Sequence, residues 1–176
     1  GDPQYAMSAQ AVDGAIKLTS ANANLNTRKE DNGIILYKEL EGDFLVQTKV
    51  VALDGQAEHR TPAYNEGGLI VLDDSGNRGQ EIIHIGVFPN YNCGNMLTHV
   101  RGYSRPQYPR GNGWNYDPYL QIERTGDIFT IRTSQDGKSW TDMPGSPIHA
   151  PQLNGKKLKV GLYQTTYTDN KSWVSF

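Results

Sequence analysis

The chain has 176 residues, and its 17 basic and 19 acidic side chains are intermixed and give a net charge of −2. This balance provides no electrostatic footprint for nucleic acid or an anionic membrane. No apolar run approaches the roughly 20 residues of a membrane-spanning helix, so membrane insertion is not expected. The single cysteine, Cys93, excludes a disulfide framework and is expected to be an inert thiol.

A single domain is expected over residues 1–176, because all-β sandwiches often reach this length undivided. A chain of this size buries roughly 70% of its unfolded surface and needs no metal or disulfide to fold. Residues 1–10 are predicted to form a poorly ordered N-terminal tail. The opening GDPQYAM is compatible with an export signal that has been removed.

Short strand patterns separated by turn residues recur along the whole chain, and no window has the apolar spacing of a helix. About eleven strands without helices predict two packed antiparallel sheets. The predicted strands cover residues 15–19, 34–38, 44–53, 68–73, 81–88, 97–103, 119–124, 127–134, 140–143, 158–167 and 172–176. Turns are expected at Asp54-Gly55, Ser75-Gly76, Gly94, Asn112-Gly113, Asp136-Gly137 and Asn154-Gly155.

The segment 119–134 predicts a β-hairpin in which Thr125-Gly126 forms the two-residue turn. In this register Ile122 faces Phe129 and Leu120 faces Ile131, which gives one apolar face. The other face is mostly polar, with opposed pairs Tyr119–Arg132, Gln121–Thr130 and Glu123–Ile128. Arg124 and Asp127 are expected to close the hairpin as an ion pair. Such a sheet packs on one side and leaves the other free to bind.

Strands 81–88 and 97–103 are predicted to pair with each other across the connecting loop. In the expected register, Ile83, Ile85 and Val87 face the core together with Thr98 and Val100. The opposite face then gathers His84, His99, Arg101 and Tyr103.

Two long polar segments, residues 57–67 and 104–118, interrupt the strand pattern, and loops of this length are usually functional or mobile. The second contains Trp114 and Tyr116, which its irregular spacing does not assign to the core. Trp140 and Trp173 lie at or near strands and are expected to be core or edge packing residues.

Three blocks of sequence carry a resemblance to a known family: GGLIVLDDSGN (67–77), YLQIERTGDIFTIRTSQDGKSWT (119–141) and KVGLYQTT (159–166). In this order they resemble bacterial concanavalin A-like sandwich domains. More narrowly, they are similar to the C-terminal modules of β-xylosidase-like glycoside hydrolases and to free-standing secreted proteins of unknown function. The resemblance implies an all-β, two-sheet antiparallel jelly-roll sandwich with sugars held on a concave sheet or its rim loops. It also implies a possible structural calcium ion, for which no ligands are assigned; no other cofactor is expected.

A sugar requires planar donors, acceptors and an aromatic platform, and the polar face is expected to supply them. The expected ligand-binding residues are His84, His99, Arg101, Tyr103, Trp114, Tyr116, Gln121 and Glu123. The alternative is an ordinary solvated sheet face. A zinc site from His84 and His99 lacks a third ligand, so no metal residues are predicted.

Glycoside hydrolysis requires two carboxylates roughly 5–10 Å apart. The E-x-D-x-E pattern of catalytic concanavalin A-like glucanases is missing from this sequence, and Glu81 and Glu123 are the remaining candidates for a catalytic pair. No G-x-S-x-G elbow supports a Ser-His-Asp triad. The segment Asp73–Asn77 lacks the order of an EF-hand loop and is explained by a hairpin turn.

The expected function is therefore non-catalytic binding of an oligo- or polysaccharide. The protein would be a bacterial glycan-utilisation protein that is secreted, periplasmic or on the cell surface. One alternative is a glycoside hydrolase or polysaccharide lyase acting on plant or host glycans. Another is a structural module that binds no ligand and supports a catalytic partner domain or chain.

Overall fold

The computed structural model describes residues 8–21, 33–60, 64–73, 81–102, 104–166 and 168–176. The expected binding residue Tyr103, the expected turn at Ser75-Gly76 and the first seven residues of the expected tail lie outside these ranges. No helix among the described residues has the length and apolar character needed to cross a membrane.

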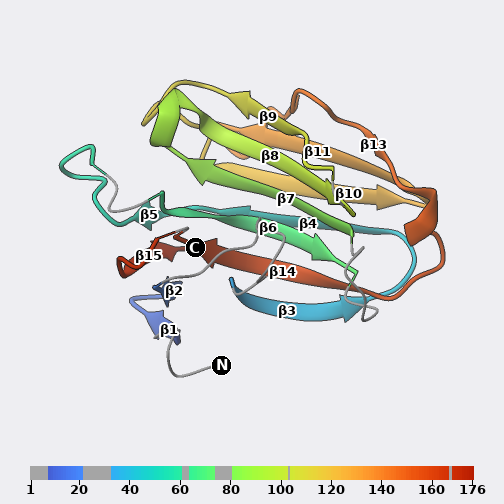
Figure 1. The fold of residues 1–176 in the computed structure, drawn as a ribbon, viewed down its shortest axis with the longest axis horizontal. Helices are drawn as coiled ribbons and strands as arrows, with labels where there is room; N and C mark the ends of the chain where they lie inside the picture. Colours follow the sequence, from blue (N-terminus) through green and yellow to red (C-terminus); the bar gives the residue numbers. More distant parts are fainter. Residues whose placement is uncertain (1–7, 22–32, 61–63, 74–80, 103, 167) are drawn as a thin grey trace.

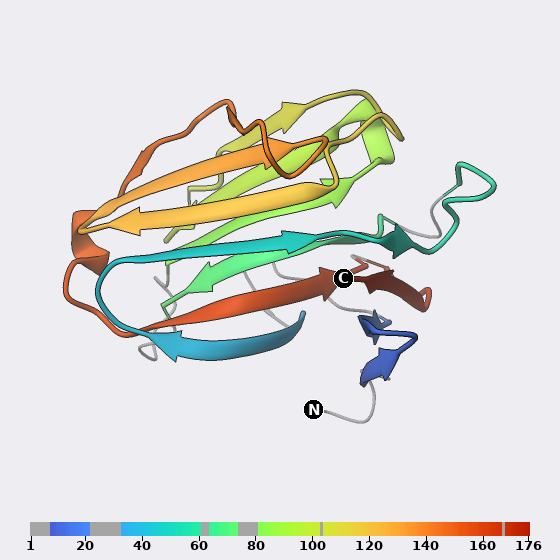
Figure 2. The same ribbon diagram turned by 180° about the vertical axis from the view of Figure 1, so that it is seen from behind.

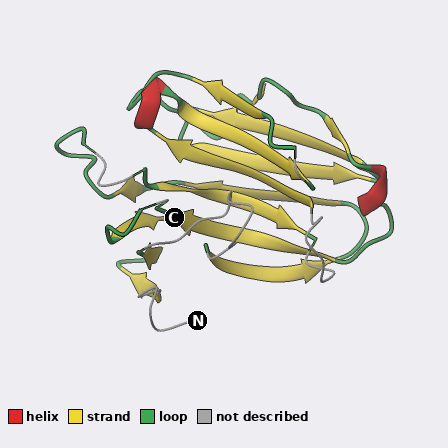
Figure 3. Cartoon of the chain, in the orientation of Figure 1, coloured by secondary structure: helices red, strands yellow, loops and turns green. Residues whose placement is uncertain are grey.

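Strands make up nearly all the regular structure of the described residues, as Figure 3 shows, which confirms the all-β prediction. The larger sheet has six strands in the order β3-β14-β6-β7-β8-β9, and a second has the order β12-β11-β10-β4 with β13 beside β11. The six are β3 (Ile34–Leu40), β14 (Leu158–Thr165), β6 (Glu66–Leu72), β7 (Glu81–Phe88), β8 (Gly94–Arg101) and β9 (Gln107–Arg110). The second sheet contains β12 (Thr141–Asp142), β11 (Ile128–Ser134), β10 (Tyr119–Thr125), β4 (Phe44–Lys49) and β13 (Ile148–His149).

A smaller four-stranded sheet lies at the end of the sandwich where the C-terminus is marked in Figure 1. Its strands run in the order β1 (Ser8–Val12), β2 (Ala15–Ser20), β15 (Ser172–Ser175) and β5 (Ala52–Leu53). Residues 8–10, expected in the tail, therefore belong to a paired strand. The short 3-10 turns η2 (Asn90–Asn92) and η3 (Pro151–Leu153) connect strands elsewhere.

The main hydrophobic core fills the space between the two larger sheets, which lie face to face in Figures 1 and 2. Alternate residues of β7, such as Ile83 and Ile85, meet Leu120 and Ile122 of β10 in one buried cluster. The outer surface of the six-stranded sheet is covered as well, because Ile70 and Ile82 form part of a second buried cluster. The central strands β6, β7 and β8 are thus buried on both sides.

The β10–β11 hairpin has the predicted faces but not the predicted register. Ile122 pairs with Ile131, and Thr125 pairs with Ile128, so the turn residues are Gly126 and Asp127. Gly126 has a φ of 61° at the first central position, as a type II′ turn requires. The shift of two residues preserves the alternation, and Leu120, Ile122, Phe129 and Ile131 are all buried.

The expected ion pair between Arg124 and Asp127 is wrong. Arg124 lies on the core side of β10 opposite Phe129, whereas Asp127 accepts a hydrogen bond from His149 Nε2 at 2.8 Å. The physical reason is the position of the turn: once Gly126 and Asp127 occupy it, Arg124 and Asp127 are no longer cross-strand partners.

The expected register of β7 and β8 is also wrong, although the two strands do pair. His84 lies opposite Thr98 and Ile83 lies opposite His99, so the two histidines are on opposite faces of the sheet. Because both faces are buried, apolar Val100 belongs on the outer side, where it packs with Ile70 and Ile82. A rule that places every apolar residue on one face fails for such a sheet.

Candidate functional site

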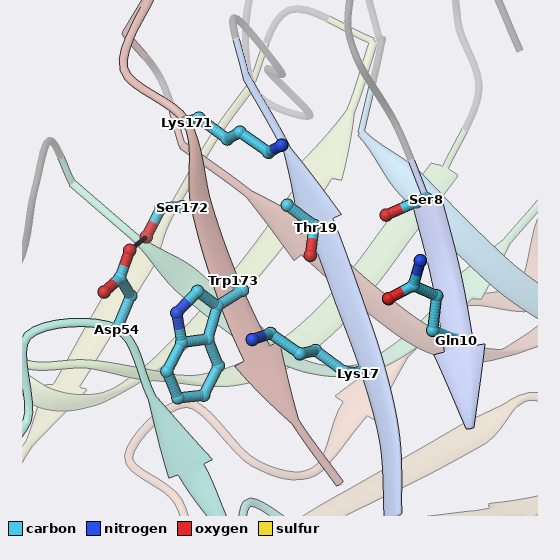
Figure 4. Close-up of a pocket in the computed structure, with 8 residues that line it drawn as sticks. All are labelled: Ser8, Gln10, Lys17, Thr19, Asp54, Lys171, Ser172 and Trp173. Carbon is cyan, nitrogen blue, oxygen red and sulfur yellow. Dashed lines mark hydrogen bonds between the residues drawn. The ribbon is translucent and has the colours of Figure 1, made fainter. Parts of the chain in front are cut away.

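A shallow pocket of about 350 Å³ opens on the outer face of the four-stranded sheet. Figure 4 shows that an indole ring and polar side chains surround it. The lining residues are Ser8, Gln10, Lys17, Thr19, Asp54, Lys171, Ser172 and Trp173.

The register of three strands brings this set together. Ser8 of β1 lies opposite Thr19 of β2, and Thr19 lies opposite Trp173 of β15. Residues directly opposite each other share a face, so the three side chains form one row across the sheet. Leu18 and Val174, at the alternate positions, are buried on the other side. The period of two thus places an apolar side inward and the pocket outward.

Lys17 and Trp173 make the central contact of the pocket. The Lys17 ammonium lies 4.1 Å from the centroid of the Trp173 ring, a distance typical of a cation–π interaction. Asp54 enters from the end of β5, where its backbone N–H donates to the Trp173 carbonyl at 3.0 Å. Its carboxylate accepts a hydrogen bond of 3.4 Å from the Ser172 hydroxyl. Both charge signs therefore border the indole.

A hydrogen-bond network among buried side chains holds the backbone carbonyl of Trp173 in place. Asn65 Nδ2 donates to the Trp173 carbonyl at 2.9 Å, and Gln164 Nε2 donates to Asn65 Oδ1 at 2.8 Å. The Ser20 hydroxyl donates in turn to Gln164 Oε1. Satisfied buried networks are rigid, so the indole stands on a well-ordered base.

The pocket combines an apolar ring surface with hydroxyl, amide, ammonium and carboxylate groups. Ligand sites of this kind take orientation from a few polar groups and contact area from aromatic rings. Among the described lining residues, Asp54 is the one carboxylate, whereas glycoside hydrolysis needs two that converge.

The structure divides the residues expected to form one binding face among separate places. His84 lies on the outer side of the six-stranded sheet and is fully buried. Its Nδ1 lies 2.8 Å from the Tyr163 hydroxyl, which donates to Glu66 Oε1 at 2.6 Å. His84 is therefore part of an enclosed polar cluster and not of an open platform.

The inner side of the same sheet also carries His99, Arg101 and Glu81, which lie outside the apolar core. His99 Nε2 bonds to Glu81 Oε1 at 2.5 Å, and Arg101 is exposed opposite Glu81 in the register. His84 and His99 face opposite sides and cannot share a metal ion. The described residues contain no cluster of three or more His, Cys, Asp or Glu side chains suited to a metal.

Gln121 and Glu123 do lie together, on the outer face of the five-stranded sheet, and they converge on Arg132. Arg132 Nη1 donates to Gln121 Oε1 at 2.8 Å and to Glu123 Oε2 at 2.7 Å. Arg132 Nε donates to Asp142 Oδ1 at 3.0 Å. The hydrogen bond to Glu123, followed by that to Asp142, raises the pKa of the Arg132 guanidinium. These groups satisfy one another.

The candidate catalytic pair does not converge. Glu81 belongs to the six-stranded sheet and faces its inner side, whereas Glu123 belongs to the other sheet and points away from the interior. The physical reason is that the two strands lie in different layers, and sandwich layers are about 10 Å apart.

Trp114 and Tyr116 are half-buried and pack against the main core, contrary to the expectation that their loop keeps them outside it. Trp114 also stacks on His59, with ring centroids 5.5 Å apart. Burial raises the pKa of the Tyr116 hydroxyl. The loop is held in place by Asn95, whose side chain bonds both the N–H and the carbonyl of Asp117.

The pocket around Trp173 was not predicted from the sequence, which assigned this tryptophan to core or edge packing. In β2, Lys17 and Thr19 alternate with Ile16 and Leu18, which marks one polar face, whereas β15 has a serine on each face and gives no such signal. That signal gives no information on pairing, because β2 and β15 come from opposite ends of the sequence.

The sheets and their connections define a jelly-roll sandwich of the concanavalin A-like class, as the resemblance implied. A functionally unknown protein from Saccharomyces cerevisiae superposes with a TM-score of 0.69 and 18% identity, over 96% of this chain and 87% of that chain. A xylan beta-1,4-xylosidase from Bacillus halodurans C-125 superposes with a TM-score of 0.65 and 13% identity, over 99% of this chain and 34% of that chain. The GH43 BlXynB protein from Bacillus licheniformis superposes with a TM-score of 0.62 and 14% identity, over 96% of this chain and 33% of that chain.

This chain therefore spans about a third of the length of each of the two Bacillus proteins. At these identities the likeness shows the fold alone. No protein-family model matches the sequence, and no curated protein matches it.

Proposed function

We propose that this protein is a non-catalytic carbohydrate-binding domain and that its ligand occupies the Trp173 pocket. The observation that carries the proposal is the half-buried Trp173 indole, which stands on a rigid base and is bordered by Gln10, Thr19 and Asp54. The apolar C–H face of a sugar stacks on an aromatic ring, while its hydroxyls need donors and acceptors at the rim.

The fold supports the same class of ligand, because two of the structurally similar proteins are a xylan beta-1,4-xylosidase and a GH43 protein. Xylan is accordingly the first polysaccharide to test. The affinity is expected to be modest, since a few hydrogen bonds and one stacking surface must offset the cost of immobilising the ligand.

Binding is favoured over hydrolysis by the placement of the carboxylates. Glu81 and Glu123 face different directions in different sheets, and the described lining of the pocket contains Asp54 alone. A hydrolase requires an acid and a second carboxylate on either side of one glycosidic bond.

A glycan array followed by titration calorimetry tests the proposal. The wild type is expected to retain at least one polysaccharide, and Trp173→Ala is expected to abolish retention. Trp140→Ala is the matched control, because Trp140 is also half-buried but lies outside the pocket. Circular dichroism confirms that each variant is folded. If the wild type binds no glycan, or if both tryptophan variants bind equally well, the proposal is wrong.

We further propose that the domain works beside a glycan-active domain or chain and outside the cytoplasm of a bacterium. The coverage of about a third of each Bacillus protein supports the first part, since a domain of this fold is built into larger glycan-active chains there. An accessory role predicts that the domain accelerates a xylanase on insoluble xylan but not on a soluble substrate. Equal rates with and without the domain contradict this role, and a cytoplasmic pool in fractionated cells contradicts the location.

A further inference from the structure

We propose that Tyr64 and Tyr91 form a second sugar-binding subsite, so that the ligand is a linear polysaccharide chain rather than a single terminal sugar. The inference rests on the proposed function of the Trp173 pocket. These two exposed rings belong neither to the hydrophobic core clusters nor to the lining of the Trp173 pocket.

The two tyrosines come from different connections and meet on the surface. Tyr64 precedes β6, and Tyr91 belongs to η2. Their rings stack with centroids 5.3 Å apart and an interplanar angle of 18°, and the Tyr91 hydroxyl donates to the Tyr64 hydroxyl at 2.8 Å. Tyr91 remains 72% exposed and Tyr64 37% exposed. The side chain of Tyr91 is therefore mostly open to solvent, and that of Tyr64 is partly open.

The backbone holds these rings in an unfavourable conformation. Tyr64 has a φ of 52° and Tyr91 a φ of 53°, in the left-handed region that bulky residues rarely adopt. Such strain is retained where the surrounding structure enforces it, and it is concentrated at functional sites. Burial does not explain the strain at Tyr91, because that side chain is mostly exposed. Presentation of the ring to a ligand does explain it.

The chemistry of this surface favours a neutral ligand. The segment 89–92 reads PNYN and carries no charge, and Asn92 is exposed beside Tyr91. Phe88 supports Tyr91 from the core side, with ring centroids 6.5 Å apart. Aromatic faces with hydroxyl and amide groups at the rim match a sugar, whereas an anionic ligand requires cations.

The tyrosine pair is linked to the Trp173 pocket through the buried side chain of Asn65. Asn65, which follows Tyr64 in the chain, donates its side-chain N–H to the Trp173 carbonyl. Summing the covalent and hydrogen-bond lengths along this path places the Cα atoms of Tyr64 and Trp173 at most about 14 Å apart. An oligosaccharide of several units is needed to contact the Trp173 indole and the tyrosine pair together.

Calorimetry with xylobiose, xylohexaose, cellobiose and cellohexaose tests the inference. For at least one sugar series, the hexasaccharide is expected to bind about tenfold more tightly than the disaccharide. Tyr91→Ala is expected to remove this advantage and to leave disaccharide binding unchanged. Tyr91→Gly is a second variant, since glycine tolerates the positive φ and keeps the fold stable. Tyr37→Ala is the control, because Tyr37 is an exposed tyrosine on β3.

The outcomes separate this inference from the proposed function. If both chain lengths bind equally and the Tyr91 variants match the wild type, the second subsite is wrong while the Trp173 pocket stands. If Trp173→Ala leaves binding intact and the Tyr91 variants abolish it, the primary site has been misplaced. Absence of binding to all four sugars overturns the inference, and the proposed function then depends on the array.

Discussion

The guanidinium of Arg124 lies over the ring of Phe129, with its central carbon 5.7 Å from the ring centroid. Arg124 is 2% exposed, although it stands at the end of a strand. Its nitrogens donate to the carbonyls of Gly126, Lys156 and Leu153 at 2.9, 3.0 and 2.6 Å. One arginine thus ties the β10–β11 turn to η3 and closes that end of the core.

Replacement of Arg124 by Met is expected to lower the free energy of unfolding by about 3 kcal/mol, because three carbonyls lose their donor. Urea denaturation measures the change. Arg132→Met is the control: Arg132 is 28% exposed, and ion pairs at the surface contribute about 1 kcal/mol or less. An equal decrease in the free energy of unfolding in both variants would show that the buried contacts of Arg124 stabilise the protein no more than a surface ion pair does.

Gly86→Ala is expected to destabilise the protein by about 1–3 kcal/mol through overpacking. A Cβ at this position would meet the Tyr163 hydroxyl and would lie 3.0 Å from Glu66 Cγ. Thermal denaturation measures the loss. Gly14→Ala provides the comparison, since its Cβ meets nothing within 4 Å and the positive φ alone costs about 1 kcal/mol. A Gly86→Ala variant as stable as the wild type contradicts the crowding of this cluster.

Cys93 is expected to react slowly with iodoacetamide at neutral pH. Partial burial, followed by the negative charge of Glu66, raises the pKa of the Cys93 thiol. The thiolate is the nucleophile, so its fraction near pH 7.5 is smaller than that of a free thiol. When alkylation rates of the protein and of glutathione are measured across a range of pH, the midpoint of the rate–pH curve should be higher for Cys93 than for glutathione. A midpoint below that of glutathione would indicate a reactive cysteine.

Asp136 gives the turn before β12 a pH dependence. The backbone N–H groups of Ser139 and Lys138, and then the Ser134 hydroxyl, lower the pKa of the Asp136 carboxyl. A pKa lower in the folded than in the unfolded state means that the stabilisation is complete above the unfolded value, about 3.9. It is lost as the pH falls through the folded pKa. NMR titration should give an Asp136 midpoint below that of a model peptide; an unshifted midpoint rules out this turn geometry in solution.

Lys17→Ala is expected to increase glycan affinity by two- to fivefold. The ammonium lies over the Trp173 ring, and a stacking sugar must displace it at a cost of about 0.5–1 kcal/mol. Calorimetry with the polysaccharide retained by the wild type measures the effect. A decrease in affinity would instead identify Lys17 as a hydrogen-bond donor to the ligand.

The hairpin shows what sequence alternation can predict. Leu120, Ile122, Phe129 and Ile131 face the core as expected, because a register error of two residues leaves the faces unchanged. The same reasoning failed for β7 and β8, where both faces are covered. Apolar residues then occur on both sides, and Val100 no longer marks the inner one.

The candidate site was less predictable than the fold. Gln121 and Glu123 were expected to share a face with Arg132, and they do, but Arg101 of the expected binding face lies in the other sheet. The Trp173 pocket depends on the pairing of β2 with β15. Alternation within β2 identifies an outward face without identifying the neighbouring strand, and the sequence of β15 has a serine on each face.

Leu18 and Val174 are direct partners across β2 and β15 although nearly the whole sequence separates them. Contacts between such distant positions form only after a large entropic cost of loop closure, and sheets that depend on them assemble slowly. Local hairpins such as β10–β11 are expected to precede this sheet during refolding. Glycan binding would then be the last property to recover during refolding, and its rate of recovery would report the formation of the complete native state.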